Sequence, residues 1–138
     1  MKRTILVLAP VLALGLAAGT IGSRVLWAQS PPVARTILQQ KELAEAEGKE
    51  LVMYRVDIVP GGVVGKHFHP GPELVYVMEG ALTIQHDGHP PVTLKAGDSA
   101  YIPGKHIHNA WNPSKTEQVK GMVFLVGDKG QPLAIPVQ

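Results

Sequence analysis

The sequence predicts an all-β fold, a sandwich or a barrel, in a single domain. The 138 residues include 15 glycines and 12 prolines, a balance that favours many turns over long helices. In the second half of the chain, short apolar runs alternate with turn sequences at regular intervals, which is typical of β-sandwiches and barrels. A chain of this length can bury one hydrophobic core but not two.

The first 28 residues are interpreted as an export signal that does not belong to the fold. A basic start at Lys2 and Arg3 precedes an apolar stretch over residues 4–18. We predict cleavage after Ala28, which makes the mature chain periplasmic or secreted. The alternative is an uncleaved membrane anchor, for which the apolar stretch is short against a span of roughly 20 residues.

Removal of residues 1–28 changes the charge of the chain. Lys2, Arg3 and Arg24 leave with them and no acidic residue does. Ten basic and eleven acidic residues remain, so the formal charge moves from +2 to −1. No basic excess remains to indicate a nucleic-acid partner. The chain has no cysteine, which excludes thiolate metal ligands and thiol nucleophiles.

The remaining chain divides into a lead-in, residues 29–50, and a β-domain, residues 51–136. In the lead-in, residues 35–40 favour a strand and residues 41–47 a short helix that Gly48 would end. Gly, Pro and Asp-Gly turns bound the strands of the β-domain. These strands are predicted at 51–59, 74–78, 81–86, 92–94, 99–102, 107–111 and 119–126.

A group of metal-ligating residue types lies between the first two strands of this domain. His67 and His69 are two residues apart, so on a strand both imidazoles project from the same face. Glu73 follows closely, but the intervening 70–72 segment contains two prolines and interrupts the strand, so parity does not place Glu73 on that face. Imidazoles with a nearby carboxylate suit a divalent transition metal.

Two motifs in this region resemble those of the cupin superfamily. The first motif is matched at every position, by Gly61, His67, His69, Glu73 and Gly80. The second motif is matched by Gly97, Pro103, His108 and Asn112. Lys105 stands where the family has a glycine, and the adjacent Gly104 is expected to supply the permissive backbone that the turn needs.

The resemblance implies a double-stranded β-helix, the jelly-roll barrel of cupins, with residue 35 as an alternative start of the family domain. It also implies one divalent transition metal, Fe, Mn, Ni, Cu or Zn, at the centre of the barrel. The implied ligands are His67, His69, Glu73 and His108. His106 shares strand parity with His108, but the spacing of the motif from Pro103 favours His108 as the ligand.

Further residues are predicted around this site. Glu73 would act as a ligand and occasional proton acceptor, and His106 is either a solvated residue near the barrel mouth or an acid–base group. Asn112 would either orient a ligand histidine or hold the turn before Pro113.

The cavity wall is predicted to be apolar, which favours a neutral or aromatic ligand. Val75 and Val77 are expected to line it, together with some of Tyr54, Tyr101, Ile102, Met122 and Phe124. His86 and His89 flank the Asp87-Gly88 turn and are expected to be exposed hairpin residues.

The resemblance implies a metal-dependent enzyme acting on a small organic substrate, with a dioxygenase-like oxidoreductase favoured. The alternatives are a metal-dependent isomerase or decarboxylase, and a non-catalytic periplasmic module that binds a metal or a small ligand. Residues 31–40 are a candidate for strand pairing or swapping in a homodimer. Membrane contact is expected only through the N-terminal segment, if that segment stays uncleaved.

Overall fold

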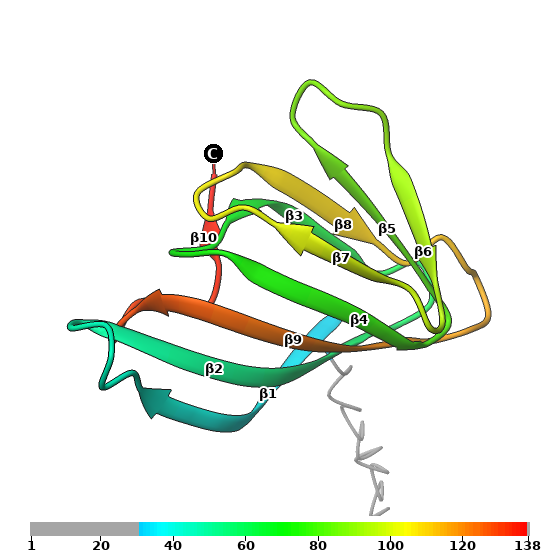
Figure 1. Ribbon diagram of the computed structural model, residues 1–138. Helices are drawn as coiled ribbons and strands as arrows, with labels where there is room; N and C mark the ends of the chain where they lie inside the picture. The colour runs from blue at the N-terminus through cyan, green and yellow to red at the C-terminus, as the bar shows by residue number, and fades with distance from the viewer. Residues whose placement is uncertain (1–30, 138) are drawn as a thin grey trace, which may run out of the picture.

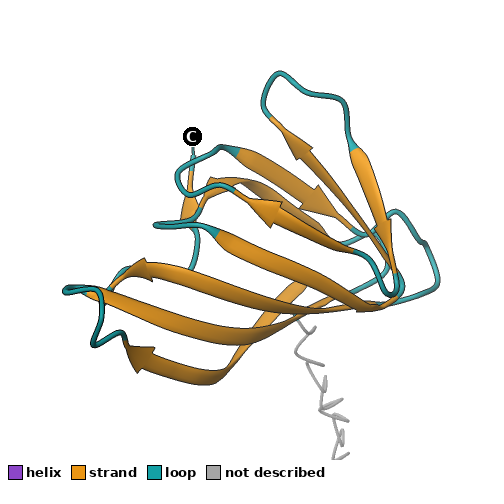
Figure 2. Cartoon of the chain, viewed as in Figure 1, coloured by secondary structure: helices purple, strands orange, loops and turns teal. Residues whose placement is uncertain are grey.

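The computed structural model describes residues 31–137, which form strands, turns and loops (Figures 1 and 2). The predicted export signal, residues 1–28, lies outside this range. Within the range, no helix is long and apolar enough to cross a membrane. The strands are β1 Val33–Glu42, β2 Lys49–Ile58, β3 Val63–Phe68, β4 Glu73–Glu79, β5 Ala81–His86, β6 Val92–Lys95, β7 Ser99–Ile102, β8 His108–Trp111, β9 Val119–Asp128 and β10 Ile135–Pro136.

Two five-stranded antiparallel sheets pack against each other (Figure 1). The first has the order β1-β2-β9-β4-β7 and the second the order β10-β3-β8-β5-β6. Strands that are neighbours in a sheet are mostly distant in sequence, as for β2 with β9 and β3 with β8. The chain therefore crosses repeatedly between the sheets and encloses a space between them, which confirms the predicted all-β fold.

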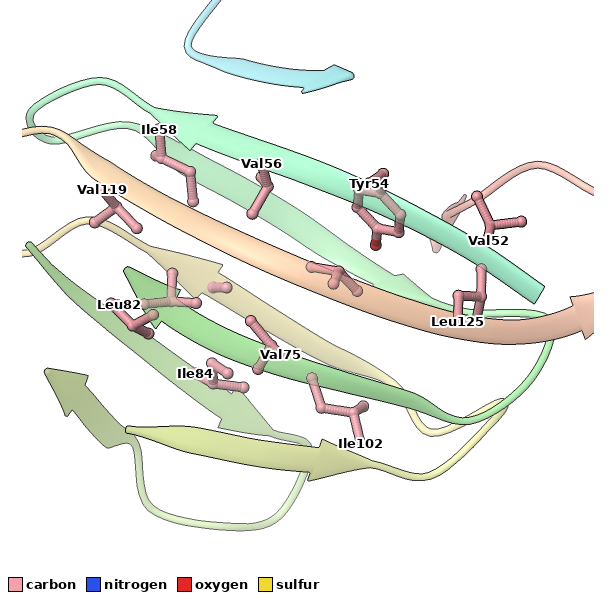
Figure 3. Packing of buried hydrophobic residues seen from close by; sticks show 13 residues of the cluster. Val52, Tyr54, Val56, Ile58, Val75, Leu82, Ile84, Ile102, Val119 and Leu125 are labelled. Atoms are coloured by element: carbon pink, nitrogen blue, oxygen red, sulfur yellow. The ribbon is translucent and has the colours of Figure 1, made fainter. Parts of the chain in front are cut away.

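The core lies between the two sheets and is built by alternation along the strands (Figure 3). On β2, Val52, Tyr54, Val56 and Ile58 are buried, while the residues between them face outward and are more accessible. Each fully buried aliphatic side chain contributes about 1.5–3 kcal/mol to stability. The opposite sheet supplies further core side chains, including Leu82 and Ile84.

The predicted helix at residues 41–47 is wrong. Strand β1 continues to Glu42, and residues 43–48 form the turn that leads into β2. The backbone N–H of Leu43 donates to the carbonyl of Lys49 at 3.0 Å, and Gly48 has φ 73°. Nucleation of a two-turn helix costs free energy that so short a helix does not recover. Continuing β1 to Glu42 instead adds hydrogen-bonded pairs with β2.

The turns next to the predicted metal ligands, at Gly71 and at Gly104, are tightly packed. A Cβ on Gly71 would lie 1.8 Å from the carbonyl oxygen of Val126, so only glycine fits there. A Cβ on Gly104 would lie 2.7 Å from the backbone of Gly71. The expectation that Gly104 supplies the permissive conformation is corrected: Lys105 itself adopts φ 64°, and Gly104 instead permits the close approach to Gly71.

Candidate metal centre

Three histidines meet between the two sheets. His67 on β3 pairs directly with His108 on β8, and residues paired in this way project from the same face. His69 follows the end of β3, and its ring centroid lies 4.9 Å from that of His67 and 5.1 Å from that of His108. One ligand atom of each residue lies within 4.8 Å of the others, and all three residues are buried. The triad is able to hold a metal ion.

Backbone carbonyls orient all three rings. The Nδ1 of His67 donates to the carbonyl of Gly65 at 2.7 Å, and that of His69 to Leu133 at 2.6 Å. His108 Nδ1 donates to the carbonyl of His106 at 3.1 Å. A carbonyl only accepts, so Nδ1 carries the proton and Nε2 is left as the lone-pair donor, the arrangement found in metal-bound histidines.

The side chain of Asn112 makes its hydrogen bonds away from the triad. Its Nδ2 donates to the carbonyl of Val59 at 3.1 Å and to that of Glu117 at 2.7 Å. Its Oδ1 accepts from the backbone N–H of Ser114 at 3.0 Å. Of the two predicted roles, these contacts correspond to holding the turn after β8.

Glu73, the first residue of β4, brings a carboxylate from the opposite sheet to the triad. Its Oε1 lies 3.1 Å from His69 Nε2, and its Oε2 accepts a hydrogen bond from the Tyr54 hydroxyl at 3.1 Å. The carboxylate therefore stands beside the triad, with Oε2 hydrogen-bonded and Oε1 close to a ring nitrogen that carries no proton, as two ligands of one ion would lie. Three nitrogen donors and this oxygen donor form a set that suits a divalent transition metal.

Burial dominates the electrostatics of the site. It lowers the pKa of His69 to about 3 and that of His108 to about 4, and it also lowers the pKa of His67. Burial raises the pKa of the Glu73 carboxyl to about 7, against the opposing effects of the Tyr54 hydrogen bond and the Arg35 charge. The histidines are thus neutral near pH 7, the form in which imidazole binds metals.

The cavity next to the triad is small, about 40 Å³. Val75 lines it, as do Tyr54 and Ile102, whereas Val77 is fully buried elsewhere in the core. Tyr101 and Phe124 project from the outer face of the first sheet and are 62% and 39% exposed. The wall is mainly apolar, as predicted, but it includes one cation, Arg35.

The remaining histidines lie at the end of β5 (His86), in the turn after it (His89) and in the loop before β8 (His106). His106 and His89 are exposed and line a surface hollow together with His86. His86 differs from its predicted exposed position, because it pairs with His108 across β5 and β8, with the ring centroids 5.4 Å apart. Its Nδ1 is buried and has no hydrogen-bond partner between residues 31 and 137. It shares strand parity with the buried Leu82 and Ile84, which the hairpin interpretation overlooked.

Two residues at this site had no assigned function in the sequence analysis. Tyr54 was expected only as a candidate for the wall, and its hydrogen bond to Glu73 depends on the pairing of β2, β9 and β4. Arg35 lies in the segment predicted as a lead-in, residues 29–50. The available signal was its alternation with Val33 and Ile37, which puts an arginine on the apolar face of a strand.

Similar solved structures and one family model agree with this geometry. No curated protein matches the chain. Similar solved structures include a cupin domain from Bordetella pertussis, with 23% identity over 70% of this chain and 94% of that one, and a TM-score of 0.56. An oxalate oxidase in complex with the substrate analogue glycolate has 26% identity over 80% of this chain and 57% of that one, and a TM-score of 0.60.

A third similar structure is the DMSP lyase DddQ from Ruegeria pomeroyi. It has 24% identity over 84% of this chain and 57% of that one, and a TM-score of 0.64. The family model described as a cupin domain matches residues 54–125, more than half of the chain, and includes all four proposed ligand positions. Together with the two-sheet fold and the buried histidine triad, this match shows that the protein belongs to the cupin superfamily.

Proposed function

We propose that this protein is a metal-dependent enzyme acting on a small organic substrate, with a dioxygenase-like oxidoreductase as the favoured class. The single observation that carries the proposal is the convergence of His67, His69 and His108, each with its Nδ1 fixed by a backbone carbonyl. This orientation leaves the Nε2 lone pairs of three buried imidazoles facing one another, which costs free energy unless they gain a partner such as a metal ion. Glu73 is proposed as the fourth ligand.

The residues around the ion have separate roles in this proposal. A divalent transition metal bound here would supply polarisation of a substrate oxygen or activation of dioxygen. Glu73 would hold or release a proton at Oε2, where the Tyr54 hydroxyl lies at 3.1 Å. The apolar wall, including Val75 and Ile102, would exclude bulk water from the substrate.

The similar structures support a small substrate but leave the reaction class open. One is an oxalate oxidase with bound glycolate and another is a DMSP lyase, so one fold accommodates both an oxidase and a lyase. The second candidate is a non-catalytic module that binds a metal or small ligand. The small volume of the cavity, about 40 Å³, restricts any substrate to a short molecule and also suits a site that holds a metal alone, as this alternative requires.

Oxygen consumption separates these candidates. The mature chain, loaded in turn with Fe(II), Mn(II), Ni(II), Cu(II) and Zn(II), would be assayed with small hydroxy acids, catechols, flavonols and β-diketones. The proposal expects oxygen uptake that requires both a metal and one substrate class, and that is lost in Glu73→Gln. Conversion of substrate without oxygen uptake would indicate an isomerase, decarboxylase or lyase. Binding without conversion would indicate the module.

A further inference from the structure

Arg35 is the cation at the mouth of the cavity, and its position follows from strand pairing. It lies on β1 directly opposite Val56 of β2. Val56 is buried and faces the space between the sheets, and paired residues of antiparallel strands share a face. The Arg35 side chain therefore points to the same side and lines the cavity that contains His67, His69 and Glu73, while the residue itself remains solvent-exposed.

The charge of Arg35 acts on the site and is not neutralised by a close carboxylate. No acidic side chain between residues 31 and 137 forms an ion pair with it within 4 Å, whereas the Arg55 Nε lies 2.7 Å from Asp57. Burial is the main cause of the raised pKa of Glu73 and of the lowered pKa of His69; the Arg35 charge opposes the first shift and adds to the second. The carboxyl group that lines the cavity, Glu73, already accepts a hydrogen bond from Tyr54 and lies 3.1 Å from His69 Nε2.

A guanidinium in this position matches one class of ligand. Its planar N–H groups bind a carboxylate through two parallel hydrogen bonds, and the interaction strengthens beside an apolar wall. The metal ligands lie deeper in the same cavity, which offers about 40 Å³. A ligand that reaches both groups must therefore be short, with an anionic end near the mouth and an oxygen donor at the inner end.

We propose that Arg35 is a specificity-determining residue that binds the carboxylate of a small organic acid, whose second oxygen group faces the histidine triad. This inference rests on the proposed function and narrows its small organic substrate to short carboxylic acids, in place of the neutral or aromatic ligand expected from the sequence, because Arg35 lines the cavity. It also assigns a role to β1, which positions the guanidinium over the opening.

Ligand binding to the metal-loaded protein tests the inference with a matched pair of probes. Lactate and lactamide have nearly the same size and share a hydroxyl group, but only lactate carries a carboxylate. Calorimetric titration of the wild-type chain should show lactate binding at least tenfold tighter than lactamide. Arg35→Gln should abolish this preference by weakening lactate alone, and Arg35→Lys should restore part of it because the charge returns without the planar fork.

Arg55→Gln is the control, because Arg55 projects from the outer face of β2 and pairs with Asp57. It should leave the binding of both probes unchanged. Equal binding of lactate by wild type and Arg35→Gln would overturn the inference, as would an equal loss of both probes, which indicates a structural role. Tighter Arg35-dependent binding of inorganic phosphate than of lactate would overturn the carboxylate assignment.

Metal content, measured before any probe is added, separates a failure of the role assigned to Arg35 from a failure of the proposed function. A wild-type chain that binds metal but does not discriminate between the probes would contradict the role of Arg35 and leave the proposed function standing. A chain that takes up no metal would overturn both. Normal metal content in Arg35→Gln, with the lactate preference lost, is the expected result.

Discussion

Lys105 occupies a backbone conformation that glycine adopts more easily. Its φ of 64° lies in the left-handed region, where a side chain costs about 1–2 kcal/mol. The adjacent Gly104 cannot exchange roles with it, because a Cβ there would collide with Gly71. The turn before His108 is thus held in a strained state at one residue.

Replacement of Lys105 by glycine should therefore stabilise the fold. We expect Lys105→Gly to raise the free energy of unfolding by up to about 1 kcal/mol, since relief of strain exceeds the entropy that glycine adds to the unfolded chain. Urea denaturation measures the change. A control at the same position, Lys105→Gln, removes the charge and keeps the strain, so a gain in both variants would contradict this explanation.

His106 and His108 share strand parity, and the structure separates their surroundings. His108 is buried within the triad, while His106 is exposed and contributes its backbone carbonyl to orient His108. We expect His108→Ala to lose bound metal and His106→Ala to keep it, because alanine preserves that carbonyl. Metal analysis of the two purified variants makes the measurement, and the reverse result would reassign the ligand.

At the scale of the elements, the segments whose structure depends on nearby residues could be predicted from the sequence. The segments that depend on pairing with distant strands could not. Strand β5 and strand β7 have the predicted bounds, because local turns end them on both sides. The error at residues 41–47 arose where pairing with β2 overrides a local helix preference. The placement of Arg35 and Tyr54 beside the triad could not be predicted, because it depends on which strands become neighbours across the sheet.

The turn between β3 and β4 depends on contact with β9. A Cβ on Gly71 would meet the backbone of Val126 at 1.8 Å, so the backbone must move to accept any side chain. We expect Gly71→Ala to lower the free energy of unfolding by about 3 kcal/mol. Gly65→Ala is a matched control, because a Cβ there has no neighbour within 4 Å. Equal effects in urea denaturation would contradict the packing argument.

At the scale of the molecule, the buried histidines should make the stability of the metal-free protein depend on pH. His69 has its pKa lowered to about 3 and His108 to about 4, against an ordinary value of 6.5, and His67 shifts in the same direction. Between the lowered pKa values and pH 6.5, the unfolded chain binds more protons than the folded chain. The free energy that the neutral histidines contribute to folding is therefore present above pH 6.5 and is lost as the pH falls.

Glu73 acts in the opposite direction, because its pKa is raised from 4.5 to about 7, and its contribution is present below pH 4.5 and lost as the pH rises. Three histidines outweigh one carboxyl, so the free energy of unfolding should fall from pH 6.5 to pH 4.5. Urea denaturation at both values tests this, and His69→Asn should show a weaker dependence. A protein equally stable at both values would contradict the expected linkage.

The central claim is that the triad and Glu73 hold one transition metal. The most direct measurement is elemental analysis of the purified chain, before and after exposure to Fe(II), Mn(II), Ni(II), Cu(II) and Zn(II) in turn. We predict about one equivalent of metal per chain, lost in a His67→Ala, His69→Ala double variant. No metal in the purified chain and no uptake of any of these ions would contradict the claim.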